Sequence, residues 1–177
     1  MNQQKVILYI SMTLDGFIAG PKGDLLAWAD YQGVEYGFDE FLSGIGCMIE
    51  GKGAYDVEIE NGWESFHSTR TIVMTHNTPS VNPNEARYIF IDGTAEEIIF
   101  AAKNLTPKNI WVVGGANVSE QFLSANLIDE IIVTITPKII NKGIHLFEKL
   151  TEHINLEVAK IDTYDKGLVQ INYRVIK

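Results

Sequence analysis

The chain has 177 residues, of which 46% are hydrophobic, with a mean hydropathy of +0.02, which predicts a single globular domain over residues 1–177. A formal net charge of -9 argues against a nucleic-acid partner, because such binders usually carry a basic face. No apolar stretch approaches the roughly 20 residues of a membrane span. The one cysteine, Cys47, cannot form an internal disulfide and is expected as a small buried hydrophobe, so we expect a cytoplasmic protein.

Apolar, β-branched runs predict strands along the whole chain. They lie at residues 6–12, 47–49, 71–75, 88–91, 109–113, 130–140 and 168–176. Several are apolar at consecutive positions, which is typical of parallel strands covered on both faces. The segment 156–176 instead alternates on either side of residues 164–167, which predicts an antiparallel hairpin.

Three helices are predicted between these strands. Residues 94–105 begin with Thr94 and Glu97 in the spacing of a capping box, and Asn117 with Glu120 repeats the device in residues 117–127. Residues 36–44 form a shorter helix that ends at a glycine. Together the elements predict an α/β fold: a three-layer α/β/α domain whose mixed, mostly parallel sheet ends in the hairpin.

Ligands of such sheets usually bind outside the carboxyl ends of the strands, so three junctions are informative. Residues 11–28 form a long irregular segment, typical of a binding loop, although a solvated excursion would look similar. In "EGKGAYD", Lys52 stands between Gly51 and Gly53, a pattern that suits an anion and equally a plain tight turn. Thr75 and His76 follow another strand, where a histidine either donates to phosphate or is an idle surface residue.

The stretch "WVVGGANVSEQFL" is a fourth junction. Gly114 and Gly115 let the backbone approach a ligand closely, and the helix that follows offers N–H groups to a diphosphate. The spacing matches neither a P-loop nor the Rossmann fingerprint, and a tight strand-to-helix turn is the alternative.

In combination, "ISMTLDGFIAGPKG", "EGKGAYD", "IVMTHN", "IWVVGGANVSEQFL" and "LIDEIIVTITPKIINKGIHLFE" resemble the dihydrofolate reductase superfamily. The resemblance is greatest to single-domain relatives of the reductase half of the bifunctional riboflavin-pathway deaminase-reductase. It implies a dihydrofolate-reductase-like fold, NADPH as cofactor, a homodimer, and hydride transfer to a small heterocyclic substrate. That substrate would be a pterin or a pyrimidine of the riboflavin-pathway type, as for 5-amino-6-(5-phosphoribosylamino)uracil reductase.

The resemblance also assigns residues. The nicotinamide carboxamide would meet backbone near Ser11 and Ile18, and Lys52, Thr75 and His76 would lie about the adenosine 2′-phosphate. The diphosphate would lie on two turns, the second of which has a cis peptide between its glycines in the family: Gly51, Gly53 and Ala54; Gly114, Gly115, Ala116, Asn117 and Val118.

Departures from the family pattern bear on the cofactor and on the substrate. Lys52-Gly53-Ala54 stands where Arg-Lys-Thr is usual, which removes a bidentate donor and a hydroxyl. Tyr9 and Val113 stand where riboflavin-pathway reductases carry a lysine and a glutamate. Tyr9, Asp15 and Trp28 are candidate substrate contacts, with core and turn-forming roles as the alternatives.

Asp30 is the candidate catalytic acid, by similarity to the single acid that follows the tryptophan of dihydrofolate reductases. Glu35 and Asp39 compete for that role, and a solvated loop carboxylate is the alternative for Asp30. We expect no metal site. The hypothesis is an NADPH-dependent reductase; the alternative is a non-catalytic nucleotide- or flavin-binding relative that keeps the fold.

Overall fold

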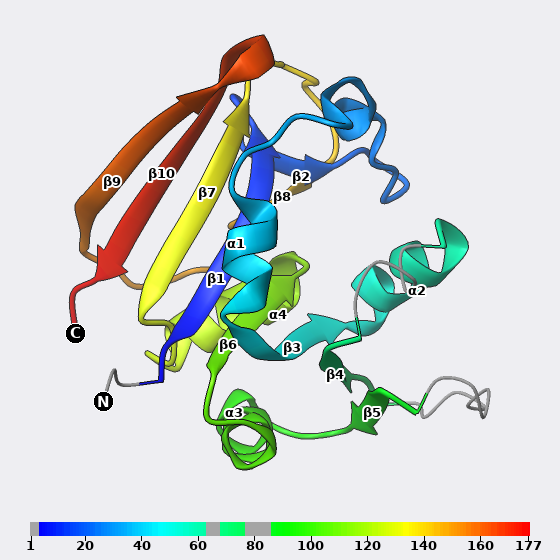
Figure 1. The fold of residues 1–177 in the computed structure, drawn as a ribbon, viewed down its shortest axis with the longest axis vertical. Helices are drawn as coiled ribbons and strands as arrows, with labels where there is room; N and C mark the ends of the chain where they lie inside the picture. Colours follow the sequence, from blue (N-terminus) through cyan, green and yellow to red (C-terminus); the bar gives the residue numbers. More distant parts are fainter. Residues whose placement is uncertain (1–3, 63–67, 77–85) are drawn as a thin grey trace.

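The structure of the protein, a computed structural model, describes residues 4–62, 68–76 and 86–177. These residues form an eight-stranded sheet with the strand order β5-β4-β3-β6-β1-β7-β10-β9, and a small sheet pairs β2 with β8 (Figure 1). The elements in chain order are β1 (Val6–Thr13), β2 (Phe17–Ala19), the 3-10 helix η1 (Leu26–Tyr31), α1 (Phe38–Ser43), β3 (Ile45–Gly51), α2 (Lys52–Glu60), β4 (Arg70–Met74), β5 (Tyr88–Ile91), α3 (Ala95–Leu105), β6 (Asn109–Gly114), α4 (Ala116–Ser124), β7 (Glu130–Thr136), β8 (Ile144–His145), β9 (Leu156–Tyr164), the 3-10 turn η3 (Asp165–Gly167) and β10 (Leu168–Val175).

The large sheet is mixed in the predicted way. Its first six strands in spatial order, from β5 to β7, are parallel to one another. β10 is antiparallel to both β7 and β9, which confirms the C-terminal hairpin. Its turn places Lys166 and Gly167 at φ values of 59° and 78°, a left-handed conformation that glycine adopts without a steric cost.

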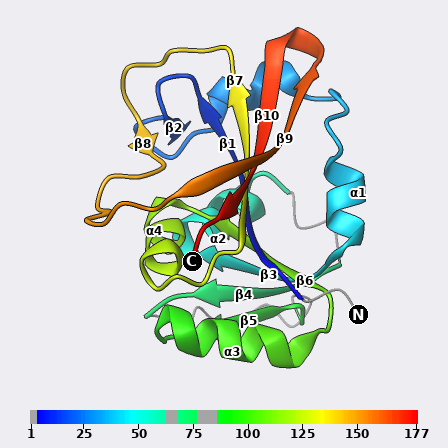
Figure 2. The ribbon, with the colours of Figure 1, turned by 90° about the vertical axis from the view of Figure 1, so that its left-hand side faces the viewer.

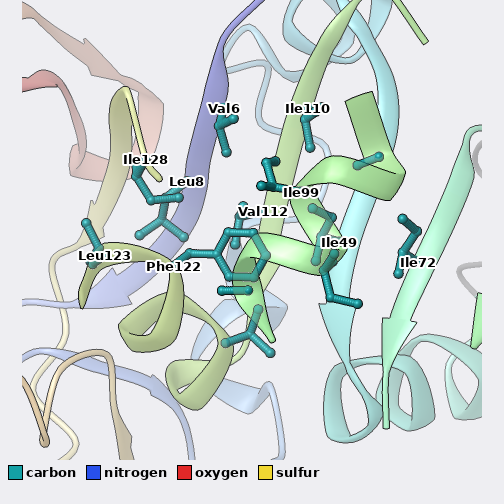
Figure 3. Packing of buried hydrophobic residues seen from close by; sticks show 14 of the residues in the cluster. Val6, Leu8, Ile49, Ile72, Ile99, Ile110, Val112, Phe122, Leu123 and Ile128 are labelled. Atoms are coloured by element: carbon teal, nitrogen blue, oxygen red, sulfur yellow. The ribbon is translucent and has the colours of Figure 1, made fainter. Parts of the chain in front are cut away.

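The principal core lies between the sheet and the pair α3 and α4. Inward-facing residues of β1, β3, β4 and β6 pack there against Phe122, Ile98 and Ile99 (Figure 3). Burial of a side chain of this size contributes about 1.5–3 kcal/mol. Cys47 also lies in this core, fully buried, and burial raises the pKa of its thiol to about 11.

The opposite face of the sheet is covered by α1, which Figure 2 shows on the side away from α3 and α4. Phe38 and Phe41 of α1 pack against Tyr9 and Trp111 of the sheet, with ring centroids of Tyr9 and Phe41 4.4 Å apart. Tyr55 of α2 packs on Val73 and Tyr88 farther along the sheet. The three-layer α/β/α architecture is therefore confirmed.

Several predicted boundaries change. The strand expected over 130–140 ends at Thr136, because Pro137 has no N–H with which to continue a ladder. The segment 11–28 is not irregular throughout: it contains the end of β1, the strand β2 and the start of η1. No helix among the described residues is long and apolar enough to cross a membrane.

Candidate functional site

The parallel strands β3 and β6 both run into helices at the same edge of the sheet (Figure 1). We call residues 51–54 and 114–118, which form these two junctions, the glycine rim. They lie together: a Cβ placed on Gly51 would be 3.0 Å from Cγ2 of Val118, and one on Gly115 would be 3.8 Å from Cδ1 of Ile18. The structure thus brings the two predicted diphosphate turns and Ile18 to one place.

Both helices that start at the glycine rim lack a side-chain cap. Gly51 is the N-cap of α2 and Gly115 the N-cap of α4, each with extended backbone and neither with a side chain to accept from the first turn. The leading N–H groups of a helix have no intrahelical acceptor, and together with the helix dipole they attract anions. The peptide bond between Gly114 and Gly115 is cis, as the resemblance implies.

The predicted cap of α4 was wrong. The helix begins at Ala116, so Asn117 lies inside its first turn with an exposed side chain. Glu120 does not reach back to the helix start, because its carboxylate accepts the backbone N–H groups of Glu148 and Lys149 instead. Side chains therefore leave the start of α4 open toward the edge of the sheet.

Lys52 is the cation of the glycine rim. Its Nζ lies 2.5 Å from Oδ1 of Asp56, one helical turn along α2, and 5.6 Å from the ring centroid of Tyr55. Both members of the ion pair are partly exposed. Among the described residues, and apart from its chain neighbours and the backbone of α2 itself, no atom lies within 4 Å of a Cβ placed on Gly53. Ala54 beside it is half-buried.

Thr75 and His76 extend the same edge beyond β4. The Thr75 N–H donates to the carbonyl of Ile91, which keeps the segment beside β5. Nδ1 of His76 lies 2.7 Å from Oδ1 of Asp92, and both side chains are exposed. Among the described residues, the Asp92 carboxylate is thus the group that holds the His76 ring at the surface.

β1 separates from β6 toward this edge. Its ladder with β6 covers only Val6 to Leu8, whereas its ladder with β7 continues to Thr13. Ser11, half-buried, therefore lies beyond the last pair with β6 and opposite Thr134 of β7. In open α/β sheets, ligands enter where neighbouring strands part in this way.

Trp28 and Asp15 hold the segment that follows β1. The indole Nε1 of Trp28 donates to the carbonyl of Ile18 at 3.2 Å. Asp15 accepts the Thr13 hydroxyl at 2.6 Å and the N–H groups of Ile140 and Asn141. Partial burial opposes its ionisation, but these hydrogen bonds prevail and lower the pKa of Asp15. Its carboxylate thus joins the turn after β1 to residues 140–141.

Asp30, the predicted catalytic acid, lies at the surface in an ion pair. Its side chain is exposed, and its Oδ2 accepts from Nζ of Lys138 at 2.7 Å. This hydrogen bond and the charge of Lys138 lower the pKa of Asp30, so the group is ionised at neutral pH. The backbone carbonyl of Asp30 also accepts from Lys166. The ion pair ties η1 to the segment after β7.

Tyr9 belongs to a buried polar network that the sequence did not reveal. The amide of Gln170 donates to the hydroxyls of Tyr9 and Thr134, each at 3.0 Å, across three strands. Burial raises the pKa of Tyr9, so its hydroxyl stays protonated and can still donate. Asn172, two residues beyond Gln170, has a buried Oδ1 with no partner among the described residues.

A second buried cluster of polar side chains was also not predicted from the sequence. Glu50, the residue before Gly51, is 1% exposed, and its carboxyl group lies beside that of Glu58 on α2, which is also buried. Arg87 and the hydroxyl of Tyr88 donate to Oε1 of Glu58, each at 2.9 Å. A charged residue in the apolar run "CMIEG" was the only available sign of this group.

The protein-family comparison matches residues 4–170 to the RibD C-terminal domain. The chain belongs to this family. Two proteins from Bacillus subtilis (strain 168) are similar to this chain over nearly their whole length. Uncharacterized protein YyaP is 30% identical, with 98% of this chain and 96% of YyaP covered, and uncharacterized protein YwjB is 27% identical, with 97% and 98% covered.

Solved structures share the fold of this RibD C-terminal domain. A protein from Shewanella sp. PV-4, provisionally named for riboflavin biosynthesis, has a TM-score of 0.88 and 22% identity, with 98% of this chain and 100% of that chain covered. A deaminase and 5-amino-6-(5-phosphoribosylamino)uracil reductase from Thermotoga maritima has a TM-score of 0.72 and 18% identity. The alignment covers 98% of this chain and 57% of that longer protein.

Proposed function

We propose that the protein is an NADPH-dependent reductase that transfers hydride to a small heterocycle. One observation carries the proposal: two uncapped helix N-termini and a glycine pair meet at one edge of a RibD C-terminal domain fold. Phosphate groups suit such N-termini because N–H donors and the positive dipole ends point at them. The chain's acidic surface provides no other general attraction for an anion.

The residues present fit a dinucleotide along this edge. The diphosphate would lie on residues 114–118 and on Gly51, Gly53 and Ala54, with Lys52, Thr75 and His76 toward the adenosine 2′-phosphate. The nicotinamide would lie beside Ser11 and Ile18, where β1 has parted from β6. When bound, the cofactor supplies the hydride, and the protein aligns the reacting groups and excludes water.

The heterocycle would lie on the α1 face of the sheet, near Tyr9. This face carries aromatic rings and, buried beneath α1, the hydroxyls of Tyr9 and Thr134 and the amides of Gln170 and Asn172, which a substrate would contact only if α1 moved aside. Such groups recognise an uncharged ring by stacking and hydrogen bonds. We assign Trp28 and Asp15 to holding the neighbouring segment in place.

A second candidate function is nucleotide or flavin binding without turnover. It is favoured by Asp30, whose ion pair with Lys138 keeps the carboxylate ionised, and by the engagement of Lys52 with Asp56. This alternative predicts that the protein binds NADPH but does not oxidise it in the presence of any substrate in the panel.

We also propose a homodimer formed through β9. This edge strand is exposed at most positions and carries three apolar side chains, Leu156, Val158 and Ile161, that are 42%, 52% and 59% exposed. The unpaired N–H and C=O groups of an exposed edge strand can pair with a strand of another chain. Ile161→Lys should shift the particle from dimer to monomer in light scattering; a wild-type monomer would refute the dimer.

NADPH binding provides the first test. At a ligand concentration 100 times Kd, binding stabilises the folded state by about 2.7 kcal/mol, which shifts the melting temperature by about 5–10 °C. We expect this shift with NADPH and a smaller one with NADH. Oxidation of NADPH should then appear with one member of a panel of oxidised pterins and pyrimidines. Absence of any response to either nucleotide would refute the reductase.

A further inference from the structure

The buried acid pair Glu50–Glu58 has a proton that the proposed reaction does not use. Two carboxyl groups buried side by side retain a proton on one of them, because two adjacent buried carboxylates would repel each other. Arg87 and Tyr88 both donate to Oε1 of Glu58, so Glu58 is the ionised member and Glu50 the protonated one. Oε1 of Glu50 is buried without a partner among the described residues, which further disfavours its ionisation.

The pair lies directly behind the glycine rim. Glu50 is the penultimate residue of β3, in register with Gly114 of β6, and it immediately precedes the Gly51 cap of α2. Glu58 lies in the last turns of α2. The shared proton therefore joins the strand and the helix on either side of the junction at Gly51.

Loss of this proton would change both charge and packing. Two buried carboxylates would then face each other, and like charges in a low-dielectric interior repel strongly. Other charged or titratable groups near the pair are Asp56 on α2, itself paired with Lys52, and Arg87 with Tyr88 at the start of β5. Among the described residues, Arg87 is the cation that contacts the pair and offsets its charge.

We propose that dinucleotide binding at the glycine rim is coupled to the proton shared by Glu50 and Glu58, so that affinity falls when this proton is lost. The inference rests on the proposed function. Repulsion between the carboxylates loosens α2 from β3 at the turn that holds the phosphates, and the added negative charge opposes an anionic ligand. By linkage, a bound dinucleotide favours the protonated pair equally.

The direction of the pH dependence follows from burial. Desolvation first, and then the charge of Glu58, raise the pKa of Glu50 well above its ordinary value of 4.5. Affinity is therefore highest below the raised pKa and falls as the pH increases through it. One coupled proton changes affinity by at most about tenfold per pH unit.

The test is the dissociation constant of NADPH, and of NADH, from nicotinamide fluorescence between about pH 6.5 and 9.5. We expect wild-type affinity for both to fall toward high pH, with a limiting slope of about tenfold per pH unit above the raised pKa. Glu50→Gln keeps a neutral donor beside Glu58, so its affinity should change less than about twofold. Glu60→Gln removes one charge from an exposed position of the same helix and should follow the wild type.

A second measurement uses the wild-type protein alone. Calorimetry of NADPH binding in two buffers of different ionisation enthalpy should detect proton uptake in the pH range where affinity falls. Equal pH profiles for wild type and Glu50→Gln, or binding without proton uptake, would overturn the coupling and leave the reductase intact. Failure to bind either nucleotide at any pH would instead overturn both proposals.

Discussion

The N-terminus of α3 and that of α4 are built in opposite ways. At α3, Thr94 accepts the N–H of Glu97, and the Glu97 carboxylate accepts the N–H of Thr94, which closes the first turn with its own side chains. At α4, Gly115 takes the cap position and offers no side chain. The same backbone chemistry is thus satisfied internally in one helix and left open in the other. The contrast suggests that α3 serves the core and α4 a ligand.

The largest effect should come from giving α4 the kind of cap that α3 has. Gly115→Asp places a carboxylate that accepts first-turn N–H groups, and a Cβ there would lie 3.8 Å from Cδ1 of Ile18, an ordinary van der Waals contact. Charge-assisted hydrogen bonds are worth about 1.5–3 kcal/mol, so NADPH should bind about 100-fold more weakly. Fluorescence titration measures this loss.

Gly115→Asn shows how much of the loss comes from occupying the first-turn N–H groups of α4 and how much from the negative charge of aspartate. It caps the helix without a negative charge, so we expect a smaller loss of affinity than with Gly115→Asp. Unchanged NADPH affinity in both variants, with the fold retained in circular dichroism, would place the phosphates elsewhere.

At the start of α2, a more cationic turn should strengthen NADPH binding. Replacing Lys52, Gly53 and Ala54 by Arg, Lys and Thr adds a bidentate donor, a second cation and a hydroxyl. NADPH should bind about tenfold more tightly, and NADH, which lacks the 2′-phosphate, should gain less. Equal gains for the two nucleotides would contradict the assignment of this turn to the 2′-phosphate.

The smallest effect is expected from a change at the N-terminus of α3. Thr94→Ala removes the cap and should lower the free energy of unfolding by about 1 kcal/mol, measurable by urea denaturation. Because α3 serves the core, NADPH affinity should not change. A large loss of affinity in this variant would remove the distinction between the two helices.

The sequence predicted features that depend on neighbouring residues. The capping box of α3, the apolar parallel strands and the alternating C-terminal hairpin are all local patterns, and each is present. The glycine pair was visible for the same reason. The cap of α4 was misplaced because Glu120 is captured by backbone 28 and 29 residues away.

Features that depend on contacts between distant residues could not be predicted from the sequence. Tyr9 and Gln170 are separated by 161 residues, and Arg87 reaches Glu58 across 29. β2 and β8 comprise three and two residues, too few to show a period. The ion pair of Asp30 with Lys138, 108 residues along the chain, likewise decides the charge of the candidate acid.

The central claim is that the open N-termini of α2 and α4 hold the phosphates of a dinucleotide. Titration of isotope-labelled protein with NADPH, followed through backbone amide resonances, tests it most directly. We predict large shifts at Lys52, Gly53, Ala116 and Asn117, and none at the capped start of α3. Shifts confined to other parts of the chain, or no shifts at saturating NADPH, would contradict the account.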